Sequence, residues 1–123
     1  MVRKVSDEVK PVRKAVQHAR NVCPVEVAAA VLGGSWKLTV VKHLLDGPVR
    51  FGVLGRAVGE VNPRVLTRQL RELESDGIVH REVFPEVPPR VEYSLTPMGA
   101  TLRPAVSWLD DWGVAYLAEL DES

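Results

Sequence analysis

Three arginines between positions 62 and 71 form the part of the sequence best suited to binding a charged ligand, because no acidic residue separates them. At about 100° of rotation per residue, a helix through this segment gathers four polar side chains within an arc of about 100°: Arg64, Thr67, Arg68 and Arg71. The opposite side carries three leucines: Leu66, Leu70 and Leu73. Guanidinium groups bind guanine edges and phosphates, so this face has the composition of a surface that reads the DNA major groove. The stripe alone is also compatible with an amphipathic surface helix that binds nothing.

Four further side chains are candidates for the same interface. Asn62 and Pro63 are typical of a helix start, where an amide and free backbone N–H groups can hold a phosphate. Gln69 lies at the flank of the arginine stripe, from which it could reach adenine or a phosphate. Lys37, near the start of an earlier helix, is a candidate for a backbone phosphate, although an ordinary solvated lysine is an equal alternative.

The elements around this helix are those of a helix-turn-helix followed by a hairpin. A short helix is predicted over residues 51–58, a tight turn over 59–61, and the arginine helix from Asn62 to Asp76, closed by Gly77. Alternating, β-branched segments at 78–84 and 90–95 predict two strands, joined by a stiff proline-rich loop. The loop from Phe84 to Arg90 would then be a wing in which Pro88 and Pro89 provide stiffness. Arg90 would enter the minor groove or contact phosphate, unless the loop is only a hairpin connection.

The remaining sequence predicts a helix from Pro24 closed by Gly33 and Gly34, and a helix over 36–46 with Ser35 as its N-cap. Thr96 and Pro97 open a last helix that Pro104 should kink. The expected fold is therefore mainly α with a small β-hairpin (α+β): a winged helix-turn-helix with an extra terminal helix. That helix carries more apolar surface than one small domain covers, which predicts a homodimer through Leu102, Leu109, Trp112, Tyr116 and Leu120, with Trp108 as a further candidate. Packing wholly onto its own domain is the alternative.

Length, charge and hydropathy limit the classes of protein to which the chain can belong. With 123 residues the chain fits one domain, and its 16 basic and 16 acidic residues exclude a wholly cationic nucleic-acid clamp. The charge is nevertheless uneven, since residues 1–20 carry six bases and two acids (net +4) whereas residues 104–123 carry five acids and no base (net −5). The absence of a long apolar run or an apolar signal region predicts a cytoplasmic protein with no membrane partner.

No residue pattern supports an enzyme or a bound cofactor. The sequence lacks a Ser/His/Asp or Cys/His arrangement at sensible spacing and a phosphate-binding glycine loop. The three histidines, His18, His43 and His80, are scattered, and no metal site is expected. The single cysteine excludes an internal disulfide.

Dense motifs over most of the chain resemble the HxlR-type family of bacterial winged-helix transcriptional regulators. These are C-P-V, G-G-x-W-K, R-F, L-x-x-Q-L-R-E-L-E-x-D-G and P-E-V-P-P-R-V-E-Y-x-L-T, spread from Cys23 to Trp112. The resemblance implies a dimeric repressor on a roughly palindromic DNA operator, with a recognition helix at 62–76, a wing at 84–90 and dimerisation through the terminal helices. It divides the chain into a basic arm (1–22), the winged domain (23–112), and the end of the dimerisation helix with an acidic tail (113–123). A winged-helix module that binds proteins without specific DNA binding is the alternative function, and the arginine stripe argues against it.

Cys23 lies directly before Pro24, at the predicted N-terminus of a helix. The helix dipole there favours a reactive thiolate. The resemblance adds that several HxlR-type regulators sense oxidants, quinones or aldehydes through a cysteine in this Cys-Pro position. Without a second cysteine, an oxidant or small-molecule effector would have to leave an intersubunit disulfide, a mixed disulfide or a sulfenate. A small buried apolar filler is the competing interpretation.

Overall fold

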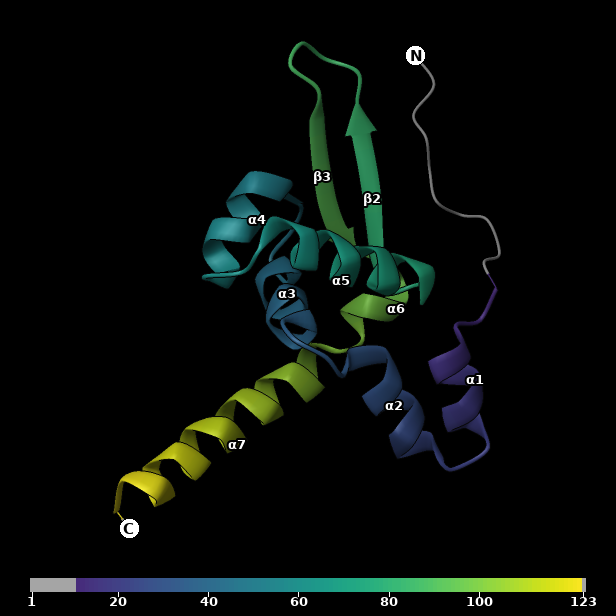
Figure 1. The fold of residues 1–123 in the computed structure, drawn as a ribbon. Helices are drawn as coiled ribbons and strands as arrows, with labels where there is room; N and C mark the ends of the chain where they lie inside the picture. The colour runs from purple at the N-terminus through teal and green to yellow at the C-terminus, as the bar shows by residue number, and fades with distance from the viewer. Residues whose placement is uncertain (1–10, 123) are drawn as a thin grey trace.

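The computed structural model describes residues 11–122, which form seven helices and three short strands (Figure 1). In chain order these are α1 (Lys14–Arg20), α2 (Pro24–Leu32), α3 (Lys37–Leu44), β1 (Val49–Arg50), α4 (Phe51–Val58), α5 (Pro63–Ser75), β2 (Val79–Phe84), β3 (Arg90–Leu95), α6 (Pro97–Ala100) and α7 (Arg103–Glu122). The predicted class, mainly helical with a small antiparallel sheet and a wing, is confirmed. Among the described residues no single helix is long and apolar enough to cross a membrane.

The sheet has one strand more than the sequence predicted. β2 and β3 form the expected hairpin, with Val79 opposite Leu95 at its base and Phe84 opposite Arg90 at its far end. The short β1 pairs with β3, so the strand order is β1-β3-β2 and the sheet is antiparallel throughout. A two-residue strand is too short to show alternation, which explains why the sequence did not indicate it. The hairpin projects beyond α5 at the top of Figure 1.

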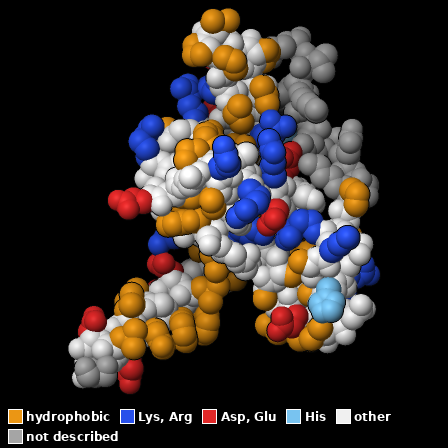
Figure 2. Space-filling view, in the orientation of Figure 1, with side chains coloured by type: hydrophobic (Ala, Val, Ile, Leu, Met, Phe, Trp, Pro, Cys, Tyr) orange, Lys and Arg blue, Asp and Glu red, His pale blue; other side chains and the backbone are white. Residues whose placement is uncertain are grey.

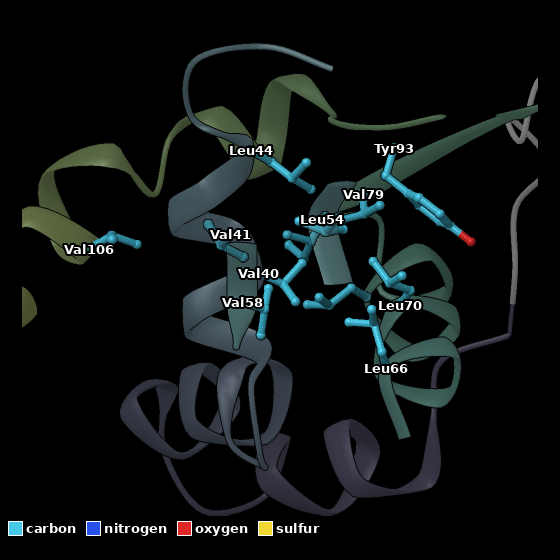
Figure 3. Close-up of a cluster of buried hydrophobic side chains, with 12 residues drawn as sticks. Val40, Val41, Leu44, Leu54, Val58, Leu66, Leu70, Val79, Tyr93 and Val106 are labelled. Atoms are coloured by element: carbon cyan, nitrogen blue, oxygen red, sulfur yellow. The ribbon is translucent and has the colours of Figure 1, made fainter. Parts of the chain in front are cut away.

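One apolar core holds α3, α4, α5 and the sheet together. The leucines predicted to face inward from α5 are buried, and Leu66 and Leu70 converge with Val40 and Leu54 in the centre of the cluster (Figure 3). Tyr93 closes the cluster from β3. Burying one such side chain contributes about 1.5–3 kcal/mol. The core therefore fixes the rotation of α5 about its own axis.

The ends of α4 and α5 are where the sequence placed them. Asn62 is the N-cap of α5, and its side-chain oxygen accepts a hydrogen bond from the Arg64 N–H at 2.8 Å. Pro63 occupies the first turn, where no N–H donor is needed. At the other end Gly77 takes the left-handed conformation (φ 77°), which lets the N–H of Ile78 reach back to the carbonyl of Leu73 at 2.9 Å.

Two predictions about the helices are wrong. Ser35 is not an N-cap: α3 follows Trp36, which adopts a left-handed conformation (φ 78°), and ends at Leu44. The predicted kink at Pro104 is also absent, because the last helix is two helices, α6 and α7, and Pro104 lies in the first turn of α7. A proline there displaces no backbone hydrogen bond.

The N-terminal basic segment is only partly described, and Arg3, Lys4 and Lys10 lie outside the described residues. From Arg13 onward the chain packs on the domain, with Ala19 of α1 buried and α1 beside α2 in Figure 1. At the other end α7 runs away from the domain for most of its 20 residues (Figure 1). Packing of the whole terminal helix onto its own domain, the alternative raised by the sequence, is therefore excluded.

Candidate nucleic-acid interface

The arginine stripe of α5 lies on the surface. Arg64, Arg68 and Arg71 are exposed and Thr67 is half-buried, while the leucines on the opposite side are in the core. Figure 2 shows Lys and Arg side chains gathered over α5 in the middle of the molecule. An open groove of about 900 Å³ runs along this face, lined by the three arginines, Thr67 and Phe51 among others. The helix thus presents its guanidinium groups together to whatever approaches the groove.

The start of α5 borders the same groove. Asn62 and Pro63 are exposed and line it beside Arg64. The Asn62 side-chain oxygen is occupied by its cap hydrogen bond, so only the amide nitrogen remains to donate to a phosphate. The contact of this residue with a phosphate stays a prediction.

The wing carries its charge at the base and apolar residues at the tip. Arg90 Nη2 lies 3.0 Å from Glu86 and Nη1 lies 3.2 Å from Glu92, and the guanidinium stacks 4.0 Å above the Phe84 ring. These contacts hold Arg90 against the hairpin. The tip consists of Val87, which is fully exposed, together with the exposed Pro88 and Pro89. The side chains of the tip itself are therefore apolar.

Gln69 does not belong to this surface. Its side chain is only 6% exposed, and its Oε1 is buried without a hydrogen-bond partner close to Gly34, in the turn between α2 and α3. The prediction that Gln69 reaches adenine or a phosphate is therefore wrong. Its position on the helix, between the leucines and the arginines, turns it towards that neighbouring turn rather than to solvent.

Lys37 is buried rather than on the predicted DNA-binding surface. It is 2% exposed, and its Nζ makes an ion pair of 2.6 Å with Oε1 of Glu72 on α5. The structure thus contradicts both the phosphate contact and the solvated lysine. Burial of a lysine needs such a partner, because an unpaired buried charge costs several kcal/mol.

A second ion pair connects the end of α5 to Arg13, the residue that precedes α1. Arg13 holds Asp76 at the end of α5 through Nε (2.9 Å) and Nη2 (2.6 Å), and also donates to the carbonyl of Ala30 on α2 at 3.1 Å. Gln69, Glu72 and Asp76 share a third face of α5, within about 60° of arc. We call Arg13, Lys37, Glu72 and Asp76 the polar clamp. In the sequence, the one sign of the polar clamp is that Gln69, Glu72 and Asp76 follow one another at intervals of three and four residues.

The clamp shifts the ionisation of its members. The hydrogen bond from Lys37 lowers the pKa of Glu72 below its usual value, against the opposing effect of desolvation. The hydrogen bond to Asp76 raises the pKa of Arg13. Both charges are therefore held across the ordinary pH range, and α5 is tied to α1, α2 and α3.

The predicted dimerisation residues separate into two groups. Leu102 is half-buried and packs against the core of its own domain, and its contact with a second protomer stays a prediction. The other four are exposed and share one side of α7, as the apolar side chains along this helix show in Figure 2: Leu109, Trp112, Tyr116 and Leu120. Trp112 and Tyr116 stack with ring centroids 5.3 Å apart. Trp108, at 63% exposed, adds to this surface.

Cys23 is the N-cap residue of α2 and is half-buried, with Pro24 following at the first helical position. Its carbonyl, rather than its thiol, receives the first N–H groups of the helix. Across residues 11–122 no group of three His, Cys, Asp or Glu side chains is arranged to hold a metal ion.

Comparison with known proteins gives a consistent result. Residues 31–121 match the profile of the HxlR-like helix-turn-helix family. The chain is 47% identical over 100 residues to the uncharacterised HTH-type transcriptional regulator YdeP of Bacillus subtilis, covering 81% of this chain and 78% of the relative. It is 48% identical over 101 residues to YybR of the same organism, covering 82% and 81% of the two chains.

Solved structures with similar sequences share the fold. The redox regulator HypR in its reduced form superposes with a TM-score of 0.76 at 48% identity, covering 82% of this chain and all of the other (100%). The reduced form of the transcriptional regulator YodB from B. subtilis superposes with a TM-score of 0.64 at 34% identity, covering 74% and 90%.

The polar clamp predicts a pH-dependent stability. Glu72→Gln should lower the free energy of unfolding at pH 7 by about 1–2 kcal/mol, a value reduced because a third of the Glu72 side chain is open to solvent. Since the pKa of Glu72 is lowered from 4.5, this stabilisation is complete above that value and is lost as the pH falls through the folded-state pKa. Urea unfolding between pH 7 and pH 3 measures it, with the exposed Glu60→Gln as control. A difference from wild type that stays constant over this range would contradict the assignment.

Proposed function

Because the chain belongs to the HxlR-like helix-turn-helix family and is a transcriptional regulator rather than an enzyme, we propose that it binds a specific DNA operator as a homodimer and represses transcription. The recognition helix is α5, which lies in the major groove. The loop between β2 and β3 enters the adjacent minor groove. An operator as partner implies that the protein acts in the cytoplasm.

The observation that carries this proposal is the arginine face of α5. Three exposed guanidinium groups and Thr67 line one groove of about 900 Å³, and the leucines behind them fix their direction. Arginine forks bind guanine edges bidentately and also bind phosphates. A protein-binding module would favour an apolar or mixed surface at these positions, so the charge supports the nucleic-acid partner.

The homodimer is supported by α7. Most of its exposed apolar side chains lie on one face of a helix that leaves the domain, with Val114 and Leu117 outside this face. An apolar face of this kind is buried against a partner in most proteins. A two-fold dimer presents two copies of α5, which matches two half-sites of a palindromic operator. The acidic residues near the end of α7 lie away from the arginine face (Figure 2).

An oxidant-responsive thiol is the second part of the proposal. HypR is described as a redox regulator with reduced and oxidised forms, and YodB has been solved in reduced and diamide-treated forms. Cys23 is half-buried at the start of α2, so an oxidant can reach it, and α2 is connected to α5 through Arg13. The effector in this proposal is an oxidant or electrophile that reacts with the Cys23 thiol.

DNA binding is tested by fluorescence anisotropy with the region upstream of the protein's own gene. Arg64→Ala and Arg68→Ala should each weaken binding by about 1–3 kcal/mol if these side chains contact bases. Arg20→Ala, an exposed arginine at the end of α1, is the matched control and should bind as wild type does. Wild-type binding that is weak and identical on every sequence would contradict the proposal.

The dimer is tested by analytical ultracentrifugation at micromolar concentration. Trp112→Asp buries a charge in the proposed interface and should give a monomer that keeps its circular dichroism spectrum. Ala118→Asp, on the opposite side of α7, should leave the dimer intact. A wild-type monomer, or equal effects of the two substitutions, would rule out this interface.

Sensing is tested by treating the protein with diamide or hydrogen peroxide. Operator affinity of the wild type should fall several-fold and recover with a thiol reductant, while Cys23→Ser should not respond. Mass spectrometry identifies the product as an intersubunit disulfide, a mixed disulfide or a sulfenate. If the oxidised wild type binds as tightly as before, Cys23 is not a sensor.

A further inference from the structure

A cavity of about 650 Å³ lies between α5 and the hairpin, next to the arginine groove described above, with which it shares Phe51 and Thr67. Thr67 of α5 lies on one side and Arg81 of β2 on the other, with Phe51 and Tyr93 also in the lining. Arg50, the exposed residue that precedes α4, is part of the lining as well. Neither Arg50 nor Arg81 belongs to the set of side chains that the sequence indicated for DNA contact.

The position of this cavity follows from the arrangement of α5 and the wing. If α5 occupies a major groove and the loop at 85–89 the neighbouring minor groove, the two elements lie on either side of one sugar–phosphate strand. That strand must pass through the space between them. The cavity is the candidate for this space, since Thr67 of α5, the start of α4 and the hairpin all contribute to its lining.

The charges in the cavity suit a phosphate. Arg81 is opposite Tyr93 in the hairpin register, and because Tyr93 faces the core, Arg81 is on the side of the hairpin that turns towards α5. Its side chain is 38% exposed, and its Nε lies 3.6 Å from Oε1 of Glu74, which is a loose pair. The acid in the lining, Glu86, is engaged with Arg90 at 3.0 Å. The cavity is therefore electropositive through Arg50 and Arg81.

We propose that Arg50 and Arg81 bind backbone phosphates of the DNA strand that separates the two grooves, and that this cavity is where the strand is held. The inference rests on the proposed function, because it needs α5 and the wing to enter adjacent grooves. Phosphate contacts carry no base information, so these two arginines contribute affinity and orientation rather than sequence preference. Arg90, held by Glu86, Glu92 and the Phe84 ring, supports the wing instead of binding the strand.

The test is a salt titration of DNA affinity on operator and on unrelated duplex. Arg50→Gln and Arg81→Gln should each reduce the slope of log affinity against log salt by about 0.9, the value for one neutralised phosphate. Both should weaken binding to operator and unrelated DNA by the same factor. Arg81→Lys keeps the charge and should restore the slope, which separates a phosphate contact from a loss of the hairpin's structure. Arg20→Gln is the control.

Single methylphosphonate substitutions in the operator locate the contact. Neutralising the phosphate that Arg81 contacts should weaken DNA binding by the wild type. It should not weaken DNA binding by Arg81→Gln any further. The proposal is overturned if both glutamine variants keep the wild-type slope, or if they change only the preference for operator over unrelated DNA. In either case Arg64→Ala and Arg68→Ala still test the proposed function. The proposed function itself fails if the wild type binds operator and unrelated DNA with the same affinity.

Discussion

The burial of one face of α5 is the constraint on which the rest of the molecule depends. Leu66, Leu70 and Leu73 are almost completely removed from solvent, and they pack against residues of α3, α4 and the sheet. Because successive residues of a helix are about 100° apart, this burial also sets where every other side chain of α5 points. The arginines face solvent as a consequence. The arginine face and the hydrophobic core are thus two sides of one helix.

The third face of α5 links this helix to the N-terminal part of the domain. Arg13 joins α1 to Asp76 and to the carbonyl of Ala30, and Lys37 joins α3 to Glu72. Buried ion pairs are weak sources of net stability, but breaking one leaves a charge without a partner, so they resist rearrangement. The polar clamp therefore holds α1, α2 and the Cys23 segment between them in place relative to α5.

The ends of α5 can be predicted from neighbouring residues, whereas contacts between residues distant in sequence cannot. Asn62, Pro63 and Gly77 act through backbone geometry within a few residues, so their roles could be recognised from position alone. Gln69 and Lys37 were misplaced because their burial depends on the turn at Gly34 and on Glu72, which are distant in sequence. The left-handed Trp36 and the break between α6 and α7 were missed for a similar reason, since neither has a local residue pattern that demands it.

The central claim is that the arginine face of α5 is the surface that contacts the operator. The most direct measurement is NMR of the protein with labelled arginine side chains and backbone amides, recorded with and without operator DNA. We expect the largest changes at the Nε–H signals of Arg64, Arg68 and Arg71 and at the amides of the loop between β2 and β3, with the far part of α7 unchanged. Changes concentrated along α7, with the α5 arginines unaffected, would contradict it.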